Sequence, residues 1–220
     1  LVALKMLKRD VIGDRTQAPS GAGYALETRM AMTRVMADEF RRTQVHRLSI
    51  FFRNLRGMLA SLLPNSDEEP RVVILTPGPR NETYFEHAYQ ASYLGYSLVQ
   101  GDDLTVRDGK VWLKSLDGLK KVDIIVRRVD DNFCDPLELR EDSHLGVPGL
   151  LQAARLGNVI IANPLGSSLL ESPGIMPFLP AITKHWLGEE ILLPSAATWW
   201  CGQKKEMDYV LEHLPDLVIK

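Results

Sequence analysis

Two adjacent arginines, Arg127 and Arg128, are the clearest candidates for ligand chemistry in this sequence. They follow the apolar run 122–126, which is typical of a strand buried on both faces, and they precede Asp130 and Asp131. A planar guanidinium donates two hydrogen bonds to a carboxylate or phosphate, so we expect one arginine to bind such an anion. Only one is expected to do so, because successive strand residues point to opposite faces. The alternative is an internal ion pair with the aspartates, which would shape the loop.

Two further loops also follow predicted strands. One is Thr76-Pro77-Gly78, after the apolar run 72–75, and the other is 163–168, after the run 158–162. Parallel strands end at one edge of a sheet, so we expect these loops and at least one exposed guanidinium to face a common cleft. The first loop lacks the G-x-G-x-x-G pattern of dinucleotide-binding folds. The alternative interpretation is that this loop is only a tight turn between a strand and a helix. Candidate anion ligands in the second loop are Asn163 and Ser167.

Strand-like and helix-like patterns alternate between residues 71 and 170, which predicts an α/β fold with a parallel sheet and helices on both faces. Asp108-Gly109 between apolar runs predicts a tight hairpin. Expected strands are 72–75, 96–100, 122–126, 158–162 and an incomplete one at 217–220; expected helices are 84–94, 147–156, 174–187 and 204–214.

The segment 26–63 is predicted to be a helix, because apolar residues recur there in steps of three and four. The residues of this face are Val45, Leu48, Phe52, Leu55, Leu59 and Leu62. The same segment is rich in arginine: Arg29, Arg34, Arg41, Arg42, Arg47, Arg53 and Arg56 outweigh Asp38 and Glu39. We favour the interpretation that these arginines lie on the solvent-exposed side of the helix. The alternative is that they form a surface that faces an anionic partner.

Composition excludes several functions. The formal net charge of −2 argues against a dedicated nucleic-acid binder, and no run of about 18 apolar residues predicts a membrane span. The two cysteines lie far apart, which favours a reducing, cytoplasmic location. No catalytic triad can be assembled, and the oligomeric state cannot be read. The five histidines lack metal-ligand spacing and are expected to be packing or surface residues: His46, His87, His144, His185 and His213.

Residues 14–29, the signature segment, resemble the signature loop of the circularly permuted type-2 ATP-grasp family, relatives of the glutathionylspermidine synthetases. The segment reads Asp14-Arg15-Thr16-Gln17-Ala18-Pro19-Ser20-Gly21-Ala22-Gly23 and continues to Arg29. Further matches in the same order include Leu75-Thr76-Pro77-Gly78-Pro79, Tyr84-Phe85-Glu86-His87, Arg127-Arg128-Val129-Asp130, Asp135-Pro136-Leu137-Glu138-Leu139 and Thr198-Trp199-Trp200-Cys201-Gly202.

This resemblance implies a Rossmann-like preliminary domain and two lobes that hold ATP and Mg²⁺ between them. On that basis residues 1–64 form a carboxyl-lobe loop with a helical segment. Residues 71–170 form the Rossmann-like domain, and a boundary falls in the proline-flanked segment 64–70. Residues 171–220 form a helical segment that leads into a truncated strand of the ATP lobe.

The resemblance also implies roles for individual residues. Lys220 contacts the nucleotide phosphates, and the loop at Ser20 and Gly21, with Arg127 or Arg128, receives the substrate carboxylate. Related ligases hold Mg²⁺ with a Glu-x-Asn pair, whose positions are Gly13 and Arg15 in this sequence. Glycine offers no ligand oxygen and arginine is a cation, so no metal is expected at this loop. Arg15 can instead stand in for the ion beside a phosphate or carboxylate.

The function implied is a part of an ATP-dependent carboxylate–amine ligase that acts on a small or peptide-like carboxylate. We expect the 220-residue chain alone to be inactive, because the family's phosphate loop follows the position of Lys220. The alternative is a degenerate, non-catalytic module that binds a peptide or a partner protein. The missing metal ligands favour the module, and the retained loops favour the enzyme.

Overall fold

The computed structural model describes residues 2–5, 10–63 and 69–220. Contacts between Cα atoms divide the chain into two compact units. The central unit is Gln17–Leu165, and the terminal unit combines Leu1–Thr16 with Gly166–Lys220. The predicted boundary segment 64–70 lies mostly outside the described residues, and the predicted division into residues 1–64, 71–170 and 171–220 stays a prediction.

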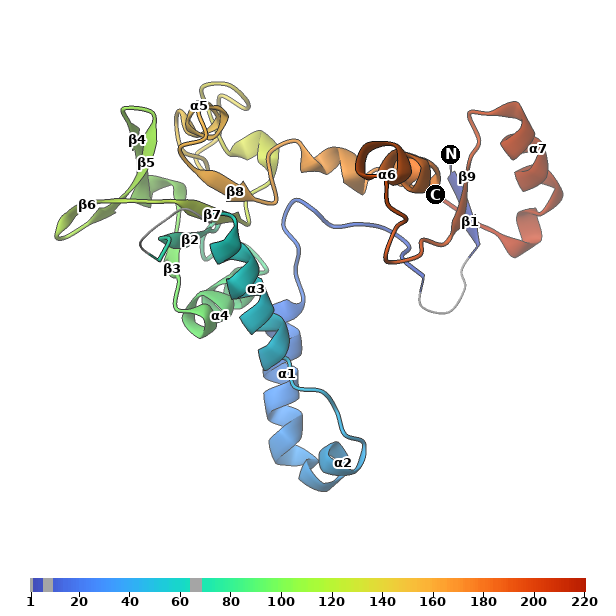
Figure 1. Cartoon of the computed structure of the whole chain (residues 1–220), viewed down its shortest axis with the longest axis horizontal. Helices are drawn as coiled ribbons and strands as arrows, with labels where there is room; N and C mark the ends of the chain where they lie inside the picture. The colour runs from blue at the N-terminus through green and yellow to red at the C-terminus, as the bar shows by residue number, and fades with distance from the viewer. Residues whose placement is uncertain (1, 6–9, 64–68) are drawn as a thin grey trace. The chain divides into compact units, whose positions relative to one another are not determined.

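The central unit is built on a four-stranded parallel sheet, which confirms the expected α/β class (Figure 1). The strand order is β3-β2-β7-β8, and every neighbouring pair is parallel. Each strand overlaps a run predicted from the sequence. Their bounds are Val72–Leu75 for β2, Ser97–Val99 for β3, Ile124–Arg127 for β7 and Ile160–Ala162 for β8.

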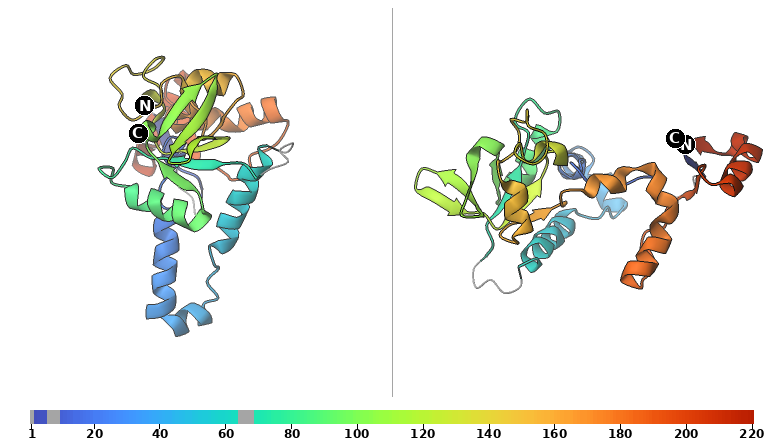
Figure 2. Two further views of the ribbon diagram at one scale, coloured as in Figure 1. Left: turned by 90° about the vertical axis from the view of Figure 1, so that its left-hand side faces the viewer. Right: turned by 90° about the horizontal axis from the view of Figure 1, so that it is seen from above.

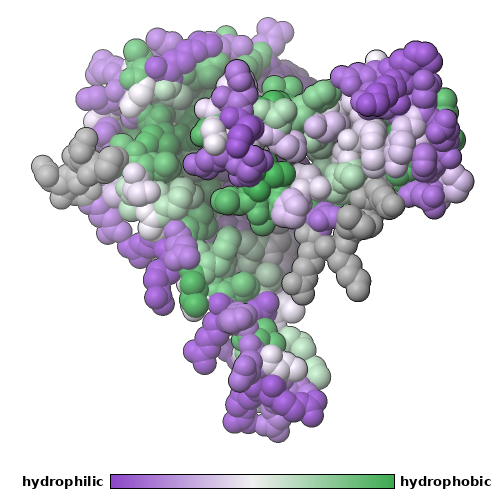
Figure 3. Space-filling model, turned by 45° about the vertical axis from the view of Figure 1, so that its right-hand side comes forward, coloured by the Kyte–Doolittle hydropathy of each residue, from purple (hydrophilic) through white to green (hydrophobic). Residues whose placement is uncertain are grey.

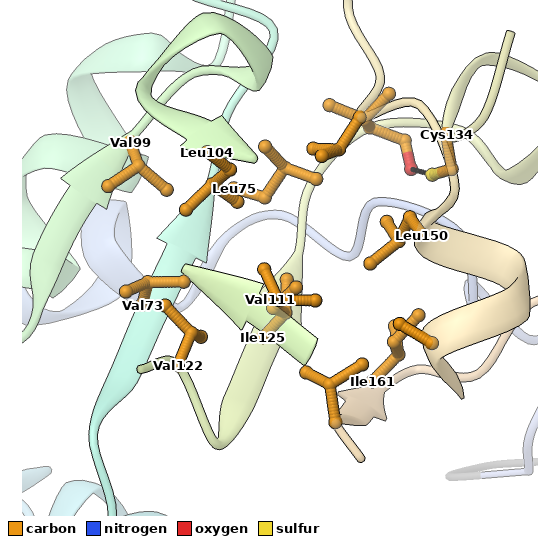
Figure 4. Packing of buried hydrophobic residues seen from close by; sticks show 14 residues of the cluster. Val73, Leu75, Val99, Leu104, Val111, Val122, Ile125, Cys134, Leu150 and Ile161 are labelled. Carbon is orange, nitrogen blue, oxygen red and sulfur yellow. Dashed lines mark hydrogen bonds between the residues drawn. The ribbon is translucent and has the colours of Figure 1, made fainter. Parts of the chain in front are cut away.

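The two faces of this sheet are covered by different elements. Val73, Leu75 and Ile125 pack on one face with Leu150 of helix α5 (Leu150–Arg155), as Figure 4 shows. Alternate residues such as Ile74 pack on the other face with α3 (Ser49–Ser61) and α4 (Tyr84–Leu94). Because side chains alternate along a strand, continuous apolar runs are buried on both sides. Helices therefore cover both faces, as expected.

A small antiparallel sheet adjoins the first face. It consists of β4 (Leu104–Arg107), β5 (Lys110–Ser115) and β6 (Gly118–Lys121), in that order. Asp108 and Gly109 both have positive φ, 51° and 68°, as a two-residue hairpin turn of the primed kind requires. The hairpin prediction is confirmed. β6 was not predicted, because its sequence, GLKK, has no alternating apolar pattern.

The prediction of one helix over 26–63 is wrong. The segment forms α1 (Ala22–Val35), α2 (Ala37–Arg42) and, after a bend, α3. The chain leaves the helix after Arg42, where Gln44 has a φ of 49° and the Thr43 hydroxyl donates to the Glu39 carbonyl oxygen. The left-hand view of Figure 2 shows α1 and α3 as separate legs joined through α2. We call residues 22–63 the helical arm.

The terminal unit contains the antiparallel sheet β10-β1-β9, formed by Val2–Lys5 (β1), Ala197–Trp200 (β9) and Val218–Ile219 (β10). The helix predicted at 174–187 is a 3-10 turn, Pro173–Phe178, followed by α6 (Leu179–Leu187), because Pro177 interrupts regular α-helical bonding. Helix α7 (Lys204–Glu212) lies within the predicted range. No helix in the described part of the chain is long and apolar enough to cross a membrane.

Candidate functional site

Arg127 stands at the carboxyl end of β7, but its guanidinium is 0 % exposed. Its nitrogens donate to main-chain oxygens of the adjacent loops and to one side chain. The acceptors are the carbonyl oxygens of Asn163 at 2.9 Å, Val129 at 2.7 Å and Pro164 at 3.4 Å, and Oε1 of Gln17 at 3.5 Å. A side chain at this edge meets the carbonyl groups of neighbouring loops, and these hold the guanidinium inside the protein.

Arg128 is also buried, at 7 % exposure, so the expectation of an exposed guanidinium at this edge is wrong. Its Nη1 donates to the Arg127 carbonyl oxygen, and its Nη2 donates to Oε1 of Gln90 at 3.3 Å. Its Nε has no hydrogen-bond partner among the residues that the structure describes. Burial lowers the pKa of Arg128 to about 10, and the charge of Arg127 adds to this, whereas Glu86 opposes it.

Glu86 is a buried carboxylate that occupies the start of α1. Its oxygens accept hydrogen bonds from the amides of Gly21 at 2.7 Å and Gly23 at 3.0 Å, and from Nε2 of Gln90 at 2.8 Å. A helix N-terminus attracts an anion, and in this case the protein supplies that anion itself. The close approach requires glycine, because a Cβ on Gly23 would lie 2.6 Å from Cγ of Glu86. The Gly21 amide, expected to receive a substrate, thus binds an internal carboxylate.

Gln17 fastens the signature segment to the edge of the sheet. Its Oε1 accepts from the Asp131 amide at 2.8 Å, and its carbonyl oxygen accepts from Nδ2 of Asn163 at 2.9 Å. Nδ2 of Asn163 also donates to the Arg127 carbonyl oxygen. Ser20 is exposed within this segment. Three predicted ligands of the central unit, Gly21, Arg127 and Asn163, therefore make internal contacts that position residues 17–23.

His87 is the second buried titratable group next to Glu86, and it is 1 % exposed. Its Nδ1 hydrogen-bonds with the Thr76 hydroxyl at 3.0 Å, and its Nε2 hydrogen-bonds with the Thr83 hydroxyl at 3.1 Å. Burial lowers the pKa of His87 to about 4; Arg128 lowers it further and Glu86 partly offsets this. The imidazole is therefore neutral at pH 7. This is the packing role expected from the sequence.

The terminal unit holds its own part of the signature segment, Asp14 to Thr16, by a different set of contacts. The Thr16 amide donates to Oε1 of Glu171 at 2.6 Å, and the Thr16 hydroxyl donates to the Ser167 carbonyl oxygen at 2.7 Å. The Ser167 hydroxyl donates in return to the Thr16 carbonyl oxygen at 3.3 Å. Ser167 thus contacts the backbone of this loop.

Arg15 and Lys220 line one cavity of about 340 Å³ in the terminal unit. Both side chains are exposed, and Nζ of Lys220 donates to the Ile12 carbonyl oxygen at 3.2 Å. Two carboxylates, Asp14 and Glu171, also line the cavity. The remaining lining residues are Ile12, Gly13, Leu170, Pro173 and Met176. The volume is at the lower end of the range for small-molecule sites.

The donor set at this cavity does not fit Mg²⁺. Glu171 already accepts from the Thr16 amide, Gly13 offers no side-chain oxygen, and Arg15 and Lys220 bring two positive charges to the cavity. Among residues 2–5, 10–63 and 69–220, no three His, Cys, Asp or Glu side chains form a group that could hold a metal. An anion suits these cations better than a metal ion does.

The sequence profile of the family described as circularly permuted ATP-grasp type 2 matches residues 6–220. The chain belongs to this family. ATP-grasp proteins generally bind ATP with Mg²⁺. The resemblance seen in the sequence is confirmed at this level.

Several relatives are uncharacterised bacterial proteins. One from Mycobacterium tuberculosis (strain H37Rv) is 43 % identical over 210 residues, which are 96 % of this chain and 24 % of that protein. One from Synechocystis sp. (strain PCC 6803) is 39 % identical over 96 % of this chain and 44 % of its own length. One from Mycobacterium leprae is 37 % identical, with 96 % and 37 % covered. The chain therefore spans from about a quarter to under half of these relatives.

Sequence reasoning missed Glu86 and Gln90 as the residues that organise the start of α1. One signal was present in the helical period of α4. Glu86, Gln90 and Leu94 recur every four residues on the buried face, so a carboxylate stands where an apolar residue is expected. A charge on the core side of a helix needs a buried partner. The amides that supply it lie more than 60 residues away in the chain.

Proposed function

We propose that the chain is part of an ATP-dependent carboxylate–amine ligase related to the glutathionylspermidine synthetases, in which the terminal-unit cavity binds the nucleotide phosphates. The observation that supports this most strongly is that Arg15 and Lys220 line the same cavity. The sequence separates these residues by more than 200 positions. The two exposed cations provide positive charge and hydrogen-bond donors for phosphate oxygens.

ATP, when bound, supplies the phosphoryl group that activates a carboxylate. The chain's own residues bind and orient it. Lys220 acts as a compact positive charge, and Arg15 presents a planar, two-donor fork. Glu171, which also lines the cavity, keeps the loop in position by accepting from the Thr16 amide.

The central unit has a supporting role in this proposal. We infer that it is the Rossmann-like preliminary domain of the family fold and that Arg127, Asn163 and Gln17 position the signature segment rather than bind substrate. Their donors and acceptors already meet each other and the main chain. The ligand role proposed from the sequence for Ser20 is retained, because Ser20 is exposed on the segment that these contacts fix. The ligand role of Ser167 in the terminal unit stays a separate proposal, and its hydroxyl already donates to the Thr16 carbonyl oxygen.

Calorimetric titration with ATP and with inorganic tripolyphosphate, without Mg²⁺, tests the phosphate site. Lys220→Ala and Arg15→Ala are each expected to weaken binding by roughly tenfold, as for loss of one charge-assisted contact. Lys205→Ala removes an exposed lysine outside the cavity and serves as the matched control. Unchanged affinity in both cavity variants would contradict the proposal.

A second function, a non-catalytic module that binds a peptide or a partner protein, is favoured by one specific observation. Glu86 fills the helix N-terminus at Gly21 and Gly23 that a substrate carboxylate would otherwise use. The two functions differ in turnover. We propose that this chain alone releases no ADP in the presence of ATP, Mg²⁺, a peptide carboxylate and spermidine. Steady ADP release that depends on the amine would favour the enzyme and exclude the module.

A further inference from the structure

The helical arm exposes apolar side chains that its own helices do not cover. Helix α1 buries only Gly23 and Leu26, and α2 buries none of its residues. The bottom of Figure 3 shows hydrophobic and hydrophilic side chains next to one another on the arm. The exposed large apolar residues are Tyr24, Met30, Met32, Val35, Met36, Ile50, Phe51, Met58 and Leu62. Four of the chain's seven methionines are in this group.

A groove of about 320 Å³ opens between the legs of the arm. Met30 and Thr33 of α1 line one side, and Leu48 and Ser49 at the start of α3 line the other. Flexible, polarisable methionine side chains adapt to a partner's surface, which makes them frequent at protein-binding grooves. Phe40 and Tyr93 add aromatic surface, and Arg29 and Arg47, which we call the rim, also line the groove. A guanidinium nitrogen of Arg29 donates to the His46 carbonyl oxygen.

The arm differs in charge from the rest of the chain. Residues 22–63 contain seven arginines and three carboxylates, Glu27, Asp38 and Glu39, which is a formal charge of +4. The whole chain has a formal charge of −2, so the other residues together have −6. Two of the carboxylates are already paired within α2, with Arg41 and Arg42. An occupant of the groove therefore meets a positive rim.

We propose that the helical arm is a docking surface for an acidic amphipathic helix of a partner protein. Apolar side chains spaced at i, i+3, i+4 and i+7 would enter the groove between α1 and α3, and carboxylates beside them would meet Arg29 and Arg47. A second copy of the chain suits the arm less well, because a symmetric contact would place one positive arm against another. This inference does not depend on the proposed ligase function.

A defined probe tests the surface. It is a fluorescein-labelled peptide of about 18 residues with leucines at that spacing and glutamates elsewhere. Fluorescence anisotropy is measured without nucleotide, so failure of peptide binding and failure of the phosphate site are separate results. We expect a Kd on the order of 10 μM, weakening as salt rises. A peptide of the same composition in scrambled order is expected to bind at least about tenfold more weakly.

Two variants locate the binding on the arm. Arg47→Glu reverses a charge at the rim, and Met30→Gln replaces an apolar lining residue; each is expected to weaken binding by about fivefold or more. Arg107→Glu makes the same charge change on β4, outside the arm, and is expected to leave binding unchanged. Circular dichroism verifies that all three variants fold.

Three results would overturn the proposal. The first is no binding up to about 1 mM peptide, which corresponds to a negligible affinity. The second is equal binding of the scrambled peptide or of the two arm variants, which indicates nonspecific charge attraction. The third is self-association of the chain, measured by light scattering, that Met30→Gln abolishes, because a second copy would then be the occupant.

Discussion

The arginines at the two candidate anion sites of this protein differ in exposure. In the central unit, Arg127 and Arg128 stand at the carboxyl edge of a parallel sheet, where ligands commonly bind, yet both are buried and bonded to the protein itself. In the terminal unit, Arg15 is exposed on the wall of a cavity together with Lys220. The topology of the sheet places a side chain near a candidate site. Whether that side chain can bind a ligand depends on whether its hydrogen-bond donors are already used within the protein.

Among the replacements considered, that of Arg127 should cause the largest loss of stability. Arg127→Ala removes the donors for three carbonyl oxygens and Gln17 and leaves a void, so we expect a loss of about 3–5 kcal/mol in the free energy of unfolding. Arg15→Ala, at an exposed position, should change stability by less than about 0.5 kcal/mol. Urea unfolding measures both. Equal effects would show that the burial contrast has no energetic meaning.

His87 makes the central unit sensitive to acid. Its folded-state pKa of about 4 lies below the ordinary value of 6.5, so the unfolded chain binds the proton more readily. Its contribution to stability is complete above pH 6.5 and is lost as the pH falls towards 4, by on the order of 3 kcal/mol. His87→Gln should flatten the pH dependence of urea unfolding between these values. An unchanged slope in that variant would assign the acid sensitivity to other groups.

Removal of the Glu86 carboxylate at the start of α1 should cause a smaller loss of stability, which an added anion should partly reverse. Glu86→Ala removes the acceptor of the buried Gly23 amide and of the partly buried Gly21 amide, so we expect a loss of about 2–3 kcal/mol in the free energy of unfolding. Acetate or formate should bind in the vacated space and restore part of the melting temperature, whereas chloride at the same ionic strength should restore less. Equal recovery with all three salts would indicate that the amides do not form an anion site.

Replacement of Asp135 should cause the smallest of these losses of stability. Its carboxylate accepts from the amides of Leu137, Gly149 and Leu151, and so organises the loop that precedes α5. Asp135→Asn retains one acceptor oxygen and loses the charge, and we expect about 1–2 kcal/mol of destabilisation. Thermal unfolding of the variant measures this. A larger loss than that of Glu86→Ala would reverse the expected ranking of the two internal carboxylates.

The sequence predicts those parts of the fold whose signals are local. The strand at 72–75, the hairpin at Asp108-Gly109 and the end of α4 at Gly95 each follow from a short pattern, and the structure contains all three. The strand at 217–220 was predicted and contains β10, but its pairing in the sheet β10-β1-β9 was not, because these strands pair across almost the whole chain length. The single helix over 26–63 failed because the apolar periodicity continues across breaks in the backbone at Met36 and Gln44.

The candidate site divides in the same way. Arg15 and Lys220 were singled out by family resemblance, and nothing in the residue pattern indicated that one cavity would contain both. Arg127 and Arg128 were placed at the correct edge of the sheet by topology. Their burial was not predictable, because it depends on Gln17, Gln90 and the carbonyl groups of a loop that follows a different strand.

Hydrogen exchange with and without ATP tests most directly whether the exposed cations of the terminal unit, rather than the buried arginines of the central unit, bind the nucleotide phosphates. ATP should slow amide exchange in residues 12–16 and 170–176, which line the terminal-unit cavity. Lys220→Ala should abolish that protection, and Lys205→Ala should retain it. Protection confined to residues 17–23 and 127–131, unaffected by Lys220→Ala, would contradict the account and return the anion site to the edge of the parallel sheet.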